Sequence, residues 1–234
     1  MKKFVSLAFA ACFGILTLAG CASDGSNSDM GNIAAGTVGG MAAESSTLAA
    51  LMSKLDSDNV LVRLGAIKGI GQLGGAGVQA VPALIPLLSS PDASIRANTA
   101  FTLGQIGPKA NAAIPDLVRL ISDKDSKTQR NAVEAIAKIG GANVPALLVP
   151  LLISVNPTVQ MSAMELLGGF GSASKAAIPT LIDLAKGNKN MRDMAFDTLV
   201  KIGPDSISAI TALLAFSDGD VVSKAAAALS LLKK

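Results

Sequence analysis

Three glycines, Gly69, Gly71 and Gly74, have the G-x-G-x-x-G spacing of a turn that can hold a pyrophosphate group. In a working site of that kind the motif follows a strand and opens a helix, so that backbone N–H groups face the phosphates. Here the glycines end the stretch LVRLGAIKGIGQLG, which has a helical apolar period. Similar sequences recur further along the chain. We therefore interpret the motif as the end of a helix and expect no nucleotide site.

Cys21 is the residue whose surroundings predict a covalent modification. It follows Lys2, Lys3 and an apolar run from Phe4 to Leu18, which suits a signal peptide and is too short to span a membrane. The quartet LAGC at 18–21 resembles the lipobox of bacterial lipoproteins. That resemblance implies cleavage before Cys21 and acylation of its thiol and amine. The alternative is an ordinary cleaved signal followed by a chance cysteine.

The same resemblance implies a location. Two or more acyl chains, palmitate among them, hold a protein stably on a bilayer. Ala22, where an aspartate would favour inner-membrane retention, resembles the pattern of outer-membrane sorting. We expect a lipid-anchored protein of the bacterial cell envelope, at the outer membrane and facing the periplasm.

Residues that usually carry catalysis are scarce. The chain has no histidine, tryptophan or tyrosine, and its two cysteines are Cys12, within the signal, and Cys21. The common general base near neutral pH, the common zinc ligands and a free thiol are therefore missing. Two Ser-Lys neighbours, at 174–175 and 223–224, fall where turn or surface residues are expected. We predict no catalytic residue, no metal site, no cofactor and no enzyme activity.

The charge does not favour nucleic acid. The chain has 20 Lys+Arg and 17 Asp+Glu; without Lys2 and Lys3 the mature protein keeps 18 against 17, a net charge of +1. Excess positive charge is lacking, and phenylalanine is the only aromatic residue that could stack on bases.

The chain repeats itself. Five similar units are marked by one position, which we number 0, and a glycine lies eleven residues after each. Position 0 is Arg63, Arg96, Gln129, Gln160 and Arg192, and the glycines are Gly74, Gly107, Gly140, Gly171 and Gly203. The steps are 33, 33, 31 and 32 residues, and a sixth, shorter unit ends the chain. Such a period is typical of repeat proteins built from stacked helices.

Each unit predicts two helices. The first, called helix A, opens with an apolar-Pro pair such as Val81-Pro82, because proline suits the first turn of a helix. Pro86 and Pro150 lie one turn further in and should kink it. A polar turn follows, with a cap for the second helix, called helix B. The expected caps are Asp92, Asp125, Asn156, Asn188 and Asp218.

These units resemble HEAT repeats, in particular the short HEAT-like repeats of phycobilisome lyases. The resemblance implies an all-α fold, an α-solenoid of about six helical hairpins. We expect a signal peptide at 1–20, a lipidated flexible tether at 21–46 and the HEAT-like repeats at 47–234. Gln129 and Gln160 stand where the family usually has arginine, which argues against a continuous Arg–Asp ladder along the stack.

The exposed face of the B helices is the candidate binding surface. Positions +3, +4, +7 and +10 are apolar or small in each unit and predict the buried stripe, whereas +5 and +9 fall outside it. In HEAT-like solenoids the B helices usually line the concave side. The candidate partner-binding residues are Lys68, Gln72, Phe101, Gln105, Glu134, Lys138, Met161, Glu165, Met194, Asp197 and Lys201.

Two interpretations of this face remain open. It could be merely solvated, because Glu134–Lys138 and Asp197–Lys201 are i,i+4 pairs in the favourable order. It could instead bind protein, because Phe101, Met161 and Met194 add apolar groups to a polar surface of mixed charge. We favour a lipid-anchored scaffold for an unidentified protein partner, which could also self-associate through its apolar C-terminal unit. The alternatives are a chromophore-handling lyase-like enzyme and a purely structural envelope protein.

Overall fold

The computed structural model describes residues 45–233, and every regular element within that range is a helix. The signal peptide, Cys21 and most of the expected tether lie outside the described residues. Residues 45 and 46, which the sequence assigned to the tether, already belong to a helix at 45–52. None of the helices between residues 45 and 233 is long and apolar enough to cross a membrane.

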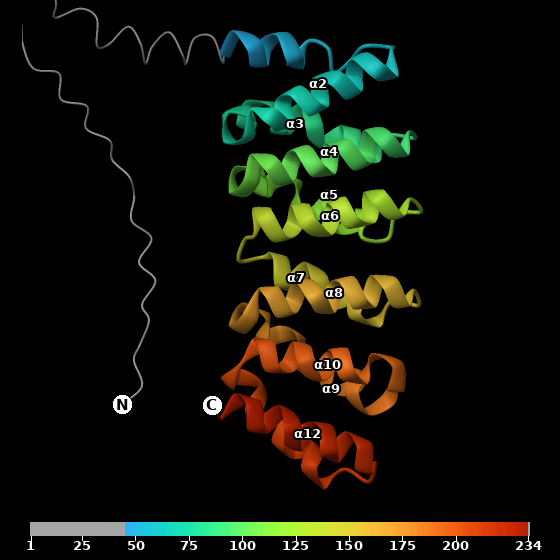
Figure 1. The fold of residues 1–234 in the computed structure, drawn as a ribbon, viewed down its shortest axis with the longest axis vertical. Coiled ribbons are helices and arrows are strands. Elements are labelled where there is room, and N and C mark those ends of the chain that lie inside the picture. Colours follow the sequence, from blue (N-terminus) through green and yellow to red (C-terminus); the bar gives the residue numbers. More distant parts are fainter. Residues whose placement is uncertain (1–44, 234) are drawn as a thin grey trace, which may run out of the picture. The chain divides into compact units, whose positions relative to one another are not determined.

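Six helical pairs follow one another in sequence order, from the blue helix at 45–52 to the red α12 (Figure 1). The B helices are α2 (Val60–Gln72), α4 (Ala93–Ile106), α6 (Ser126–Ile139), α8 (Pro157–Gly169), α10 (Lys189–Ile202) and α12 (Gly219–Leu232). The A helices are 45–52, α3 (Val81–Leu84), α5 (Ile114–Leu120), α7 (Val144–Leu148), α9 (Ile178–Gly187) and α11 (Ile207–Ala212). The predicted all-α solenoid of about six hairpins is confirmed.

An interior proline interrupts two of the A helices, at the positions where the sequence predicted kinks. α3 changes into the 3₁₀ helix η2 (Ile85–Ser89) at Pro86, and α7 changes into η4 (Val149–Ile153) at Pro150. A proline inside a helix removes one backbone donor and clashes with the preceding turn, so the helix tightens or breaks there. α11 also ends in a short 3₁₀ helix, η7 (Leu213–Ala215), but without a proline.

The predicted caps begin the B helices. Each predicted cap accepts a hydrogen bond from a backbone N–H in the first turn of its helix, and Asn59 does the same for α2. The predicted caps are Asp92, Asp125, Asn156, Asn188 and Asp218. The marker glycines end the helices with positive φ angles, for example 75° at Gly107 and 65° at Gly140. Only glycine adopts such angles without strain.

The links between units come in two lengths. Three of them are seven-residue 3₁₀ helices, η1 (Gly74–Ala80), η3 (Gly107–Ala113) and η5 (Gly171–Ala177), and η6 (Pro204–Ser206) is shorter. The link from α6 to α7 is also short: it spans 140–143 and contains no helix.

A single hydrophobic core runs through the described units. The predicted stripe supplies it: Ile67, Ile70, Ala100 and Leu103 are completely buried, although Leu73 is only half-buried. The motif of Gly69, Gly71 and Gly74 lies in the second half of α2 and at the start of η1. It therefore closes a helix, as the repeats predicted.

Candidate functional site

The predicted face of the B helices is exposed. All ten residues at positions +5 and +9 are solvent-exposed, from Lys68 and Gln72 on α2 to Asp197 and Lys201 on α10. Helical spacing places +5 and +9 one turn apart on the same side, so they form a continuous outer strip across α2, α4, α6, α8 and α10. We call this strip the B face.

Phe101 is exposed but not isolated. The residue is 42% exposed, and the Nζ of Lys138 lies 5.6 Å from the ring centroid. The same Nζ lies 2.7 Å from a carboxylate oxygen of Glu134, so the expected Glu134–Lys138 pair forms. Phe101, Lys138 and Glu134 thus make one contact cluster across α4 and α6.

Two expectations about the B face are wrong. Met194 is half-buried and packs against the core, whereas Met161 is 43% exposed as expected. In the third, fourth and fifth units position +1 is exposed and position +2 is half-buried, and Met161 and Met194 follow this pattern. Among the described residues Asp197 forms no ion pair with Lys201, because Lys201 extends over Gly168 of α8 instead: its Cδ would lie 2.8 Å from a Cβ at that glycine.

A hollow of about 700 Å³ opens on the B face between α6 and α8. Val133, Ala137, Leu166 and Phe170 give it an apolar lining. Its polar lining comes from Gln129, Arg130, Glu134, Thr158, Ser162, Glu165 and Lys201. We call it the α6–α8 groove; it brings together three of the predicted residues, Glu134, Glu165 and Lys201.

Side-chain volume explains why this pair of helices stands apart. At three other contacts position +8 is a glycine, which lets the helices approach: a Cβ on Gly104 would lie 2.9 Å from the Cα of Ala135, and one on Gly71 would lie 3.0 Å from Thr102 Oγ1. At the α6–α8 contact the corresponding residues are Ala137 and Leu166, so more volume separates the backbones. The short link at 140–143 also replaces a seven-residue 3₁₀ helix there.

Side-chain hydrogen bonds between neighbouring B helices are also missing at this contact. Thr102 donates to the Ile67 carbonyl, Asn131 to the Ala97 carbonyl and Thr198 to the Met164 carbonyl, at 3.0, 2.8 and 3.3 Å. These bonds join α2 to α4, α4 to α6 and α8 to α10. Within residues 45–233 no such bond or ion pair joins α6 to α8.

A second hollow, of about 450 Å³, lies between α2 and α4. Four predicted residues line it: Lys68, Gln72, Phe101 and Gln105. Lys138, Met161, Met194 and Asp197 line neither hollow, so the structure divides the predicted surface into two sites.

Sequence reasoning missed most of the groove's apolar lining. Ala137 is at position +8 of its unit, and Leu166 is at position +6 of the next unit. Their combined size becomes apparent only when these two positions of neighbouring units are compared. The 31-residue step between Gln129 and Gln160 was the other available signal.

Position 0 has a structural role that arginine and glutamine share. In all five units its side chain donates to a carbonyl near the end of the unit's own A helix, satisfying a group that the helix leaves free. The bonds run from Arg63 to Ser57, from Arg96 to Ser90, from Gln129 to Asp123, from Gln160 to Leu152 and from Arg192 to Ala185.

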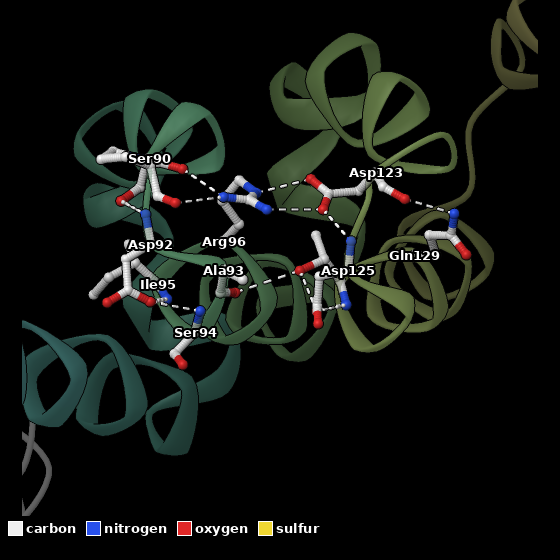
Figure 2. A network of polar contacts seen from close by, with 11 residues as sticks. Ser90, Asp92, Ala93, Ser94, Ile95, Arg96, Asp123, Asp125 and Gln129 are labelled. Carbon is white, nitrogen blue, oxygen red and sulfur yellow. Dashed lines mark hydrogen bonds and ion pairs between the residues drawn. The ribbon is translucent and has the colours of Figure 1, made fainter.

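At Arg96 and Arg192 the arginine adds a second contact, to the next unit. Figure 2 shows Arg96 between the Ser90 carbonyl and the carboxylate of Asp123, which it meets through Nε and Nη2 at 2.8 Å each. Arg192 reaches Asp218 and Asp220 in the same way, at 3.0 and 2.6 Å. The ladder is interrupted at Gln129 and Gln160, as the sequence indicated, and it is also missing at Arg63, which forms no ion pair among the described residues. The hydrogen bond from Arg96 lowers the pKa of Asp123, against the opposing effect of burial.

The described residues supply little that resembles a catalytic site. Ser174 is fully buried and its Oγ donates to the Leu167 carbonyl at 2.7 Å, while Lys224 pairs with Asp193 and lies 3.9 Å from Asp220. Neither Ser-Lys neighbour therefore forms a reactive pair. Between residues 45 and 233 there is no group of three His, Cys, Asp or Glu residues placed to hold a metal ion.

Comparisons with known proteins agree with this architecture. A family model described as HEAT repeats matches residues 81–154 and 144–231, and one described as PBS lyase HEAT-like repeat matches residues 62–90. No curated protein matches the sequence significantly.

Solved structures support the fold alone. Two engineered proteins from the Northeast Structural Genomics Consortium each show 23% identity and a TM-score of 0.52 over 80% of this chain, covering 96% and 58% of their own lengths. A designed armadillo repeat protein aligns with a TM-score of 0.48 and 19% identity, over 79% of this chain and 99% of its own.

Proposed function

The chain belongs to the HEAT-repeat family, and from that premise we propose that it is a lipid-anchored scaffold of the bacterial envelope that binds partner proteins through its B face. Repeat solenoids of this kind present extended surfaces that typically serve protein interactions. No catalytic step is part of the proposal.

The observation that carries the proposal is the B face itself. It combines an exposed aromatic ring and an apolar hollow of about 700 Å³ with charges of both signs, and the exposed Met161 of α8 lies outside the strip, at position +1. A merely solvated face needs none of these apolar groups, since exposed apolar surface that gathers in one region marks interaction sites. Mixed charge favours a protein partner over a polyanion.

Photocrosslinking in cells tests the binding face. p-Benzoylphenylalanine at Phe101 or Glu134, both exposed on the B face, should give one or two discrete adducts. The matched control is Ala146, which is exposed on the A helix α7. A uniform smear from all three positions, or equal adducts from Ala146, would contradict a specific B-face partner and favour a structural envelope protein.

The anchor is tested separately, because Cys21 lies outside the described residues. Mass spectrometry of the mature N-terminal peptide should find a diacylated or triacylated Cys21, and Cys21→Ser should move the protein from the membrane fraction to the soluble fraction. Density-gradient separation of the two membranes should place the wild-type protein in the outer membrane. An unmodified thiol at Cys21 would overturn the anchor and leave the scaffold intact.

Self-association through the C-terminal unit also stays a prediction. Sedimentation velocity of the full chain, with and without a charged substitution at the exposed Leu231, checks it.

A further inference from the structure

The α6–α8 groove has features that specify what kind of segment it can hold. Its centre is apolar: Leu166 is 4% exposed, Val133 and Phe170 are half-buried, and Ala137 is exposed. The hollow lies within the size range of small-ligand pockets, and it is open along the B face. One bulky apolar side chain can therefore be buried there.

The charges that line the groove are not equally available. The carboxylate of Glu134 is already paired with Lys138 at 2.7 Å. Arg130, Glu165 and Lys201 are exposed and have no ion-pair partner among residues 45–233. A ligand in the groove therefore meets two unpaired cations and one unpaired carboxylate.

The two cations stand at opposite ends of the groove. Arg130 is at position +1 of its unit, near the start of α6, and Lys201 is at position +9, near the end of α10. Because the B helices run in the same direction, positions +1 and +9 differ by eight residues, or about 12 Å along the helix axis. An extended chain that runs parallel to the helix axis covers this axial separation with about four residues, and Lys201 approaches the groove from α10 by extending over Gly168 of α8.

Resting on the proposed scaffold function, we propose that the α6–α8 groove binds an extended segment of a partner protein in which one bulky apolar residue lies between two acidic residues. The apolar side chain enters the hollow above Ala137 and Leu166. The acidic residues, each about two positions away, meet Arg130 at one end and Lys201 at the other.

This occupant also agrees with the lack of polar bonds between α6 and α8. A segment in the groove contacts both helices and covers apolar surface that the neighbouring units leave open. The corresponding contacts between α4 and α6 have no room for it, since Gly104 and Ala135 bring those backbones together.

Synthetic peptides and the full chain test the proposal. The probe is a fluorescein-labelled nine-residue peptide with a leucine at its centre, a glutamate two positions to each side, and glycine and serine elsewhere. Replacing both glutamates with lysine should weaken binding about tenfold, since two favourable ion pairs become repulsive. Replacing the leucine with serine should weaken it about tenfold or more, because the burial of the side chain is lost.

Protein variants locate the site. Ala137→Trp should fill the hollow and abolish binding, whereas Gln105→Trp, at another exposed B-face position, should not affect it. Arg130→Glu should weaken binding, whereas Lys127→Glu makes the same charge change on α6 at an exposed residue outside the groove and should not. Circular dichroism checks that each variant keeps its helices.

Three results would overturn the assignment: equal binding of the acidic and lysine peptides, full binding by Ala137→Trp, or no binding by the wild-type chain. An adduct from Phe101 in cells, combined with no peptide binding, would overturn the groove's specificity and leave the scaffold function standing. Peptide binding with only a smear of cellular adducts would overturn the scaffold function and leave the groove's specificity standing.

Discussion

At the scale of single residues, position 0 separates two tasks that the sequence pattern merges. Arg96 and Gln129 both bind a carbonyl at the end of their own A helix, at 2.8 and 2.6 Å. Only arginine has further donors for a carboxylate in the next unit, and Asp123 uses them. Glutamine thus preserves the turn within a unit but cannot join that unit to the next.

Variants of Arg96 should show the two tasks as separate losses of stability. Arg96→Gln keeps the bond to the Ser90 carbonyl and loses the half-buried pair with Asp123, so the free energy of unfolding should fall by about 1.5–3 kcal/mol. Arg96→Ala also removes the hydrogen bond to the Ser90 carbonyl, so the free energy of unfolding should fall by about 1 kcal/mol more. Urea denaturation measures both; equal stability of Arg96→Gln and wild type would contradict this division.

The Arg96–Asp123 pair should also make stability depend on pH. Because the bond from Arg96 lowers the pKa of Asp123 in the folded protein, the unfolded state binds this proton first as the pH falls. The stabilisation is therefore fully present above the unfolded pKa of about 3.9 and is lost as the pH falls through the lower folded pKa. The stability difference between wild type and Asp123→Asn should be constant near neutral pH and shrink below about pH 4. A constant difference down to pH 2 would contradict it.

At the scale of elements, glycine inside a B helix sets how closely two helices approach. Gly104 lies where α4 meets α6, and a Cβ there would be 2.9 Å from the Cα of Ala135. Gly65 lies in α2 with no atom within 4 Å of its added Cβ. The same residue type therefore serves packing at one position and has no steric role at the other.

Alanine substitutions should have opposite effects at these two glycines. Gly65→Ala should stabilise the protein by about 0.5–1 kcal/mol, because alanine favours the helix and meets no neighbour. Gly104→Ala should destabilise it by about 1–3 kcal/mol, because α6 must move away. Thermal and urea unfolding of the two variants compare them directly. Stabilisation by Gly104→Ala would show that α4 and α6 do not need their close contact.

At the scale of the whole array of units, the contact between α6 and α8 is the weak point of the B layer. It lacks the glycine, the side-chain hydrogen bonds and the long link found at neighbouring contacts, although the hydrophobic core continues beneath it. Repeat proteins hold together through contacts between neighbours, so one open contact permits motion of the first three units against the last three.

Distances between spin labels should reveal this motion. Labels at positions 68 and 134 are two units apart without crossing the groove, and labels at 134 and 197 are two units apart across it. All three positions are +5 and exposed. In a Cys21→Ser background, pulsed electron paramagnetic resonance should give a broader distance distribution for the second pair. Equal widths would show that the units move as one body.

The repeated sequence by itself determined the helical pairs, their caps, the kinks at Pro86 and Pro150 and the exposed strip of the B face. These features depend on local chemistry: a helical period, a capping side chain or a missing backbone donor acts within one turn of its own residue. The resemblance to HEAT repeats rested on the same repeated residues, and it indicated that the ladder is interrupted at Gln129 and Gln160.

Only the tertiary structure decided which parts of the B face join into sites. The groove depends on the summed volume of Ala137 and Leu166, on the link at 140–143 and on where Lys201 extends, and these residues belong to three different units. The inward position of Met194 and the contact of Lys138 with Phe101 are likewise decided by the neighbouring helix. Periodicity tells which side of a helix faces out, but the distance between two helices is set by all the side chains packed between them.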